Sequence, residues 1–398
     1  MHSKTFTIGE HIICLSSYTL RSSLVADLAI PRYLPTLITR KQYTMAALEN
    51  RNRPGVLLVG NFLSASTGTR GVCEDLAEAL RIAGWSVLIS SSRVSRFLRL
   101  IDFLLSVLLN RKSYSVAQVD VYSGLAFAWA ELVCWALRTV KKPYVLTLHG
   151  GNLPLFARRF GKRVMRLLQS SSAVTTPSAY LLEEMQAYRK DLVLLPNPLD
   201  LQKYPFRQRD RPAPNLVWLR AFHDTYNPSL AIRVVASLAQ DLPDVQLLMI
   251  GPDKGDGSYA ATKDLARKLG VSEKVMFPGS VPKEQIAQWL QRGDIFVNTT
   301  RVDNTPVSVL EAMACGLCII STNVGGIPYM LEDEHHALLV PSDDHAAMAK
   351  AVHRILVEGG LAERLSCNAR RKAEQFDWSN ILPRWEKLLT SVAAEHVT

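Results

Sequence analysis

The stretch that decides the fold is Asp303 to Gly316, which reads D-N-T-P-V-S-V-L-E-A-M-A-C-G. A run typical of a strand, Asp294 to Asn298, precedes it, and a second such run, Leu317 to Ser321, follows it. Between them a short polar loop leads to Pro306, which we place at the first helical position, where a missing N–H costs nothing. A strand, a loop, a helix and a strand in this order predict a βαβ unit of a parallel sheet.

Two carboxylates within this unit indicate a functional site. Asp303 lies in the loop, and Glu311 lies eight residues later on the second turn of the predicted helix. This spacing is slightly more than two helical turns, so the two carboxylates can face one pocket from different depths. The unit also brings the free N–H groups of a helix N-terminus to the carboxyl edge of the sheet, where anions and nucleotides bind.

The same alternation of strands and helices extends over most of the chain. A length of 398 residues exceeds the usual size of a single core, so two domains are expected. We expect a poorly structured leader over residues 1–54, a Rossmann-like domain over 55–200, a second over 201–377, and a terminal helix over 378–398. The predicted fold class is α/β, with two doubly wound Rossmann-like domains that face a central cleft.

The charge is unevenly distributed. The hydrophobic content of 48% and charged content of 21% are typical of a soluble globular protein, and the formal net charge is +10. Residues 45–200 hold 19 Lys and Arg against 11 Asp and Glu, whereas residues 201–398 hold 22 against 23. A basic first half beside a neutral second half predicts an anionic partner for the first half only.

The six cysteines show no disulfide framework, which indicates a reducing compartment and a cytoplasmic location. Cys315 and Cys318 form a C-x-x-C pair, but no second pair and no nearby His completes a zinc site. We therefore interpret both as small buried residues between a helix and a strand.

The run Glu311 to Gly316 reads E-A-M-A-C-G, and with the acidic Asp303 before it the stretch resembles the signature of family-4 retaining glycosyltransferases of the GT-B fold. The first acid of that signature is usually Glu, so Asp303 departs from it by one methylene. Further matches extend from about Gly55 to Trp385. The resemblance implies a metal-independent hexosyltransferase that moves a sugar from a UDP- or GDP-linked donor, with retention of configuration. It also implies that the first domain binds the acceptor, the second binds the donor, and the helix over 378–398 crosses back to the first domain.

The resemblance assigns roles to residues at the edges of both predicted sheets. His149, at the carboxyl end of a strand, would contact the sugar or the departing phosphate, and Asp303 would lie near the sugar. Arg220, at the end of another strand, would hold the diphosphate, and Glu311 would accept hydrogen bonds from the ribose hydroxyls. The remaining expected donor-binding residues are Gly68, Lys254, Asn304, Thr305, Pro306 and Val307.

The second cation that the family places beside Arg220 is missing from this chain. The family has a Lys five or six residues after the Arg, and here those positions hold Thr225 and Tyr226. Lys254, in the next strand-end loop, is our candidate replacement, because a departing diphosphate needs preorganised positive groups. The sequence contains no Asp-x-Asp pair, so we expect no metal site; we also expect no cofactor beyond the nucleotide-sugar, which is a co-substrate.

Two alternatives remain open. A nucleotide-sugar epimerase of the same architecture would release a free epimer without an acceptor. A catalytically degenerate partner subunit would bind the donor without turning it over, as the missing Lys allows.

A membrane surface is the anionic partner that we expect, and nucleic acid is not. The segments Arg93 to Lys112 and Phe156 to Leu168 combine basic and apolar residues, and we predict the second to be one basic amphipathic helix. No run reaches the roughly 18 apolar residues of a membrane span. We therefore predict a peripheral protein on the cytoplasmic face of a membrane, acting on a saccharide or lipid-linked acceptor.

Overall fold

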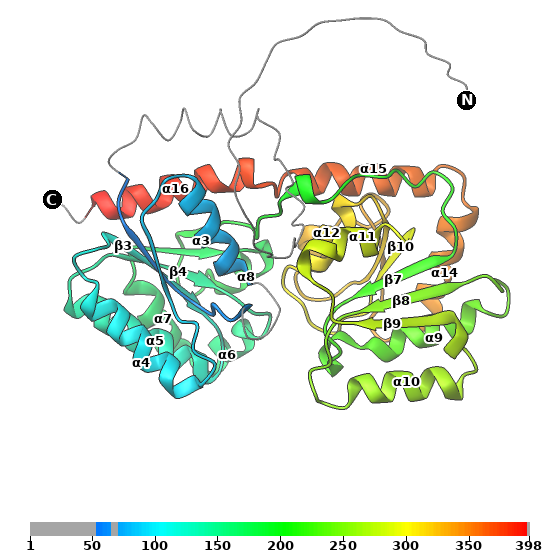
Figure 1. Cartoon of the computed structure of the whole chain (residues 1–398), viewed down its shortest axis with the longest axis horizontal. Helices are drawn as coiled ribbons and strands as arrows, with labels where there is room; N and C mark the ends of the chain where they lie inside the picture. The colour runs from blue at the N-terminus through cyan, green and yellow to red at the C-terminus, as the bar shows by residue number, and fades with distance from the viewer. Residues whose placement is uncertain (1–52, 65–70, 396–398) are drawn as a thin grey trace, which may run out of the picture. The chain divides into compact units, whose positions relative to one another are not determined.

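The computed structural model describes residues 53–64 and 71–395 (Figure 1), all within one compact unit, Asn50–Thr398. The predicted leader over residues 1–54 therefore lies almost wholly outside the described residues, and so does Gly68. Within these two ranges no helix is long and apolar enough to cross a membrane.

Six parallel strands form the first sheet, in the order β2-β1-β3-β4-β5-β6. Every pair is parallel, and the strands are largely aliphatic runs, which suits a sheet covered on both faces. The strands are β1 (Val56–Val59), β2 (Val87–Ser90), β3 (Val116–Val121), β4 (Tyr144–Leu148), β5 (Ala173–Thr176) and β6 (Leu192–Leu194). The accompanying helices are α3 (Val72–Ile82), α4 (Arg96–Leu109), α5 (Leu125–Thr139), α6 (Leu153–Arg159), α7 (Gly161–Gln169) and α8 (Ala179–Met185).

The second sheet also has six parallel strands, in the order β12-β11-β10-β7-β8-β9. Its strands are β7 (Asn215–Leu219), β8 (Gln246–Ile250), β9 (Val275–Gly279), β10 (Ile295–Asn298), β11 (Cys318–Thr322) and β12 (Leu338–Val340). Its helices are α9 (Pro228–Leu238), α10 (Ser258–Lys268), α11 (Ile286–Leu290), α12 (Val307–Ala314), α13 (Ile327–Met330), α14 (His345–Val357) and α15 (Leu361–Glu374). Short 3₁₀ turns are η1 (Leu201–Lys203), η2 (Asp224–Tyr226), η3 (Ser272–Lys274) and η4 (Lys283–Gln285), and the last helix is α16 (Trp378–Ala394). The predicted doubly wound α/β class is confirmed.

Strand order reverses once in each sheet, and the reversal creates a crevice. In the first sheet β1 and β3 are neighbours, so successive connections leave in opposite directions from this point. In the second sheet the corresponding neighbours are β7 and β10. Ligands of open α/β sheets bind at the carboxyl ends of the strands at such switch points.

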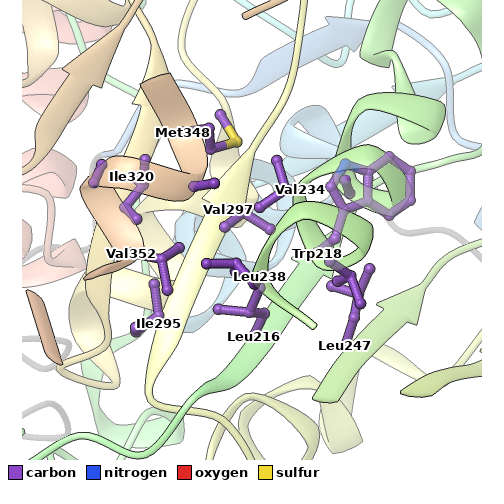
Figure 2. Packing of buried hydrophobic residues seen from close by; sticks show 14 of the residues in the cluster. Leu216, Trp218, Val234, Leu238, Leu247, Ile295, Val297, Ile320, Met348 and Val352 are labelled. Carbon is purple, nitrogen blue, oxygen red and sulfur yellow. The ribbon is translucent and has the colours of Figure 1, made fainter. Parts of the chain in front are cut away.

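Hydrophobic side chains fill both faces of the second sheet. Figure 2 shows the face where Leu216 and Trp218 of β7 pack with Val234 and Leu238 of α9. Trp218 is fully buried, and its indole Nε1 donates to Thr299 Oγ1 at 2.8 Å, so the burial leaves no polar atom unpaired. This core fixes the directions of β7 and β10, whose ends carry the site described below.

The last helix packs against the first sheet. The side chains of Ile381, Trp385 and Leu389 on α16 are buried in one cluster with Val56 and Leu58 of β1. The helix also contacts α3, β3 and β4. A segment that follows the second sheet in the chain thus completes the core of the first.

Two sequence expectations are corrected and a third is confirmed. The segment Phe156 to Leu168 is not one helix: Phe160 leaves the helical region, at φ −124° and ψ 39°, and separates α6 from α7. Pro306 is the N-cap of α12, not its first residue, because its ψ of 114° is extended. The interpretation of the C-x-x-C pair is confirmed, since Cys315 and Cys318 are both buried and unbridged, and burial raises the pKa of each thiol to about 12.

Candidate functional site

The switch point of the second sheet brings Arg220 and the loop after β10 together. Arg220 follows β7 directly, and its backbone N–H donates to Ile250 O at 3.0 Å. Gly251 lies against the same backbone at φ +148°, where an added Cβ would come within 1.8 Å of Arg220 O. Glycine is therefore required there, because only a residue without Cβ lets the loop after β8 approach Arg220.

The Arg220 guanidinium is largely buried and incompletely paired. It forms an ion pair with Asp303, and it lies over the ring of Tyr226 at 4.3 Å from the centroid. Its Nε has no hydrogen-bond partner among the described residues. Burial lowers the pKa of Arg220, while Tyr226 and Glu311 act in the opposite direction. This is a preorganised cation with one donor left for a ligand.

A cavity of about 360 Å³ opens beside Arg220 and the first turn of α12. Lys254, Lys283, Val307, Ser308 and Glu311 are among its lining residues. The hydroxyl Oγ of Ser308 is buried and has no partner within the described part of the chain. The backbone N–H groups of a first helical turn are free of intrahelical bonds, so this end of α12 and the three cations make the cavity suitable for an anion.

Glu311 lies at the buried end of that cavity. Its Oε1 accepts a hydrogen bond from the hydroxyl of Tyr204 at 2.7 Å, and both residues are almost completely buried. Burial raises the pKa of Glu311 above its ordinary value, although Tyr204, Lys283 and Arg220 each favour the ionised form. When ionised, the carboxylate has further lone pairs and can accept hydrogen bonds from a ligand at this depth.

The loop from Asp303 to Pro306 is held by contacts at its first two residues, Asp303 and Asn304. Gly326 lies so close to it that an added Cβ would come within 1.8 Å of Asn304 O, and Gly326 N donates to Asp303 O at 2.9 Å. Asn304 is buried, and its Oδ1 accepts a hydrogen bond from Ser178 Oγ, at the start of α8. The loop that follows β10 is thus positioned partly by a residue of the first sheet's helices.

His149 lies at the carboxyl end of β4, beside a second cavity of about 640 Å³. Its Nε2 is 3.0 Å from Asp120 Oδ1, and its ring stacks on Tyr122 with centroids 5.1 Å apart. A carboxylate only accepts hydrogen bonds, so Nε2 carries the proton and Nδ1 is left for a ligand. The same cavity is lined by Asp303, Asn304, Thr305 and Lys254.

The expected site residues fall into two adjoining groups. Arg220, Lys254, Val307 and Glu311 line the cavity at α12, while His149, Asp303, Asn304 and Thr305 line the cavity at β4; Lys254 borders both. Pro306 lies between the two groups, and Gly68 lies outside the described residues.

Sequence reasoning missed the polar partners of these residues. Tyr204, Lys283, Ser308, Tyr226 and Asp120 all contact or neighbour an expected site residue. Asp120 and Ser308 could have been found, since Asp120 is the penultimate residue of a strand-like run, Val116–Val121, and Ser308 lies within the stretch Asp303 to Gly316. No local sequence pattern points to Tyr204 or Lys283 as site residues, because Tyr204 lies in a linker and Lys283 in a 3₁₀ turn. Over the described ranges, no three His, Cys, Asp or Glu side chains gather to hold a metal ion.

Two protein-family models match the chain over consecutive regions. Residues 207–372 match the model described as glycosyl transferases group 1. Residues 67–203 match the model described as glycosyltransferase family 4. Together the two matches cover the second sheet and the strands of the first sheet from β2 onward.

Curated relatives include D-inositol 3-phosphate glycosyltransferases. The protein of that name from Streptomyces bingchenggensis is 31% identical over 157 residues, which is 38% of this chain and 34% of the relative. Its namesake from Mycobacteroides abscessus is 31% identical over 162 residues, which is 40% of this chain and 36% of the relative. The chain thus spans about a third of the length of the curated relatives that it matches.

Solved structures share the fold over most of the chain. Sucrose-phosphate synthase from Thermosynechococcus elongatus superposes with a TM-score of 0.70 at 20% identity, over 86% of this chain and 100% of that one. HepE from Anabaena, in complex with UDP and glucose, superposes with a TM-score of 0.68 at 15% identity, over 85% and 100%.

Proposed function

The chain belongs to the group 1 glycosyl transferases with the GT-B fold, and from this membership we propose that it moves a sugar from a nucleotide-sugar donor to an acceptor hydroxyl. The proposed donor is UDP- or GDP-linked, and the support for a nucleotide is the fold shared with HepE, whose structure is a complex with UDP and glucose. The proposal includes retention of configuration and a reaction that does not depend on a metal ion.

The observation that supports this function best is the set of buried polar atoms without partners at the α12 cavity. Arg220 Nε and Ser308 Oγ have none within the described residues, and both border a cavity with two lysines. Buried polar groups are normally paired, so unpaired ones at a cationic cavity favour a polar anionic ligand there. A nucleoside diphosphate matches that chemistry.

We assign roles to the residues on this basis. Arg220, Lys254 and Lys283 with the first turn of α12 would hold the diphosphate and stabilise the charge that grows on it as the glycosidic bond breaks. Glu311 would accept hydrogen bonds from the ribose hydroxyls. The donor phosphates would compete with Asp303 for Arg220, and Asp303 and His149 would then flank the sugar. Asn304, Thr305, Pro306 and Val307 would contact the donor through backbone groups.

The acceptor proposed is a saccharide or a lipid-linked saccharide in polysaccharide or glycolipid assembly. The support is the excess of basic residues in the first half of the chain, which fits an anionic surface. On the same ground we propose a peripheral position on the cytoplasmic face of a membrane.

A panel of UDP- and GDP-sugars tests the function. Release of nucleoside diphosphate, with the configuration of the product read by NMR, would support a retaining transferase. Release of a free epimer in the absence of any acceptor would make the protein an epimerase instead. Calorimetric binding of UDP or GDP with no turnover of any donor would indicate the degenerate partner subunit.

A further inference from the structure

A third cavity, at the switch point of the first sheet, is not used by the proposed donor. It has a volume of about 390 Å³ and lies at the carboxyl ends of β1 and β3, where the order of the first sheet reverses. Asn61, Asp120 and Tyr122 line its sheet side. Tyr122 also lines the cavity beside His149, so the two cavities share a wall. A ligand here could reach the place where we put the donor sugar.

One side of this cavity is cationic. Arg99 is 8% exposed, and its guanidinium donates to Asn61 Oδ1 at 2.8 Å and to the carbonyls of Arg93 and Val94. Arg96 lines the cavity beside it, and no carboxylate of the described residues forms an ion pair with either arginine. The carboxylate that does border the cavity, Asp120, is already engaged by His149 and Gln118. These hydrogen bonds do not cancel the charge of Asp120, but the two arginines outnumber this one carboxylate, so the net charge of the cavity lining is positive.

The other side of the cavity is apolar and continues onto the protein surface. Phe103 of α4 and Leu125 and Trp129 of α5 line the cavity, and Leu125 is 77% exposed. The two helices pack side by side (Figure 1). We call their exposed apolar side chains the α4–α5 face: Phe97, Leu98, Ile101, Leu105, Leu108, Leu109, Leu125, Leu132 and Trp135. Exposed apolar areas this extensive usually mark an interaction site.

The charges around the α4–α5 face select the kind of partner. Arg93 and Arg96 lie exposed at the start of α4, and Arg111 and Lys112 lie exposed just beyond its end. The carboxylate of α4, Asp102, is only half-exposed, and Glu131 of α5 is paired with Arg163. An apolar strip between clusters of exposed cations complements an anionic lipid surface, whose headgroups meet the cations while the apolar side chains enter below them.

The segment Phe156 to Leu168 does not offer a comparable surface. Val164, Leu167 and Leu168 of α7 are buried in the core, and Arg158 and Arg163 are paired with Glu184 and Glu131. Arg159, Lys162 and Arg166 are exposed without an ion pair among the described residues, but the exposed apolar side chains near them are only Leu155, Phe160 and Met165. The exposed apolar area is therefore smaller than that of the α4–α5 face.

We propose that the α4–α5 face docks on an anionic lipid bilayer, and that the cavity between α4 and α5 takes its acceptor from that bilayer. The acceptor is an amphiphile whose anionic group lies at Arg96 and Arg99, whose apolar part lies along Leu125 and Trp129, and whose hydroxyl passes Tyr122. This inference rests on the proposed function for the identity of the ligand as an acceptor.

Flotation of the full-length protein with vesicles tests the docking. The protein should float with phosphatidylcholine vesicles that contain phosphatidylglycerol, and much less with phosphatidylcholine alone or in high salt.

Leu105→Ser combined with Leu109→Ser should weaken binding by at least about tenfold, because two side chains lose their apolar contact. Arg111→Gln combined with Lys112→Gln should weaken the preference for anionic vesicles, because it removes one of the two clusters of exposed cations. The matched control is Met276→Ser combined with Val357→Ser, which replaces exposed side chains of the second sheet's region and should leave flotation unchanged.

Two outcomes would overturn the docking. One is that the wild-type protein floats with neither kind of vesicle. The other is that the Leu105→Ser, Leu109→Ser variant floats as well as the wild type. If the wild type does not float, and light scattering shows a dimer for the wild type and a monomer for this variant, the face is an interface between copies of the chain. Calorimetric titration with UDP and GDP in the absence of lipid keeps the two proposals apart. If the protein binds nucleotide but does not float, only the docking proposal is overturned. If it floats but does not bind nucleotide, only the proposed donor function is overturned.

The cavity is tested separately with dioctanoyl phosphatidic acid below its micelle concentration. We expect saturable binding, followed by tryptophan fluorescence, and about tenfold weaker binding in Arg96→Gln. Flotation of that variant should persist through the apolar face. Binding that does not saturate, or that is unchanged in Arg96→Gln, would show that this cavity is not the acceptor site.

Discussion

At the scale of single residues, the position that the family gives to a second cation is occupied by an aromatic ring. Tyr226 lies under the Arg220 guanidinium, and the nearby positive charges come instead from Lys254 and Lys283. Arg220 is fixed by Asp303 and by the backbone around it, whereas a Lys ammonium ends a flexible stem. The rigid guanidinium is therefore the group best preorganised for a diphosphate.

We expect Arg220→Ala to lower turnover by about 10²–10³ while the protein remains folded, as loss of a preorganised donor does in other enzymes. Lys254→Ala and Lys283→Ala should each cost less. The measurements are nucleoside diphosphate release and calorimetric affinity for UDP and GDP. Arg267→Ala is the control, because Arg267 is an exposed cation of α10 paired with Asp264. A loss in Lys254→Ala as large as that in Arg220→Ala would contradict the leading role of Arg220.

Glu311→Gln should weaken donor binding by about 1.5–3 kcal/mol, because a charge-assisted hydrogen bond to the ribose is lost. The pH dependence should change as well. Since burial raises the pKa of Glu311, its carboxylate takes up a proton at a higher pH than an ordinary glutamate does, so affinity of the wild type should fall early on acidification. Calorimetry across a pH series should show this acidic fall in the wild type and its absence in the variant.

The same substitution should not destabilise the fold. A carboxyl whose folded pKa lies above its unfolded value makes the protein less stable as the pH rises between those two values, and the cost persists at neutral pH. A neutral amide removes that cost, so the urea midpoint at pH 7 should stay equal or rise. Glu284→Gln, at an exposed position, is the control for both readouts. A clear drop in the midpoint would mean that Glu311 acts mainly as a structural anchor for Tyr204.

At the scale of elements, the break between α6 and α7 redirects the basic side chains. α7 buries Val164, Leu167 and Leu168 and turns Arg163 toward α5, where its Nε and Nη2 donate to the two carboxylate oxygens of Glu131. Phe160, at the break, packs against Phe156 with centroids 4.8 Å apart. The sequence periodicity predicts a freely exposed amphipathic helix, but in the structure α7 is joined to α5 through the Arg163–Glu131 ion pair.

A double-mutant cycle of Arg163→Ala and Glu131→Ala measures this tie. We expect a coupling free energy of about 0.5–1 kcal/mol in urea unfolding, because the geometry is bidentate but Arg163 is partly exposed to solvent. Vesicle flotation of both single variants should match the wild type. A coupling free energy near zero, together with reduced flotation of Arg163→Ala, would contradict this expectation and indicate that α7 binds lipid.

At the scale of the whole molecule, α16 joins the end of the chain to the first core. Trp385 is buried with Val56, Leu58 and Leu80, and the neighbouring Glu386 accepts a hydrogen bond from Trp85 Nε1 at 2.9 Å. Lys283 of the second sheet's region also pairs with Asp75 of α3 at 2.6 Å. The first core is therefore completed only when α16 is in place.

Trp385→Ala should destabilise the protein by about 3–5 kcal/mol, because a large buried side chain leaves a cavity that the helix cannot close. Urea unfolding followed by circular dichroism measures the loss, and limited proteolysis should show first cleavage within residues 55–200. Lys387→Ala, exposed on the same helix, is the control. A change below about 1 kcal/mol would mean that α16 packs only loosely on the first core.

The sequence by itself determined the elements and the chemistry of the central unit. Alternating apolar and polar runs are local properties, so strands such as Val116–Val121 and the helix that carries Glu311 follow from residues close in the chain. The E-A-M-A-C-G run indicated the family, and the comparisons confirm it. Break points were less secure: a single residue, Phe160, ended a helix whose periodicity continues beyond it.

Only the tertiary structure decided which side chains meet. The order of strands in each sheet, the pairing of Arg220 with Asp303 and the hydrogen bond from Tyr204 to Glu311, 107 residues apart, depend on contacts between distant segments. The α4–α5 face emerged in the same way, because a run of leucines reads alike whether the helix lies inside the protein or on its surface. Local pattern fixes what a segment becomes, whereas the packing free energy of all segments together fixes where it lies and what it touches.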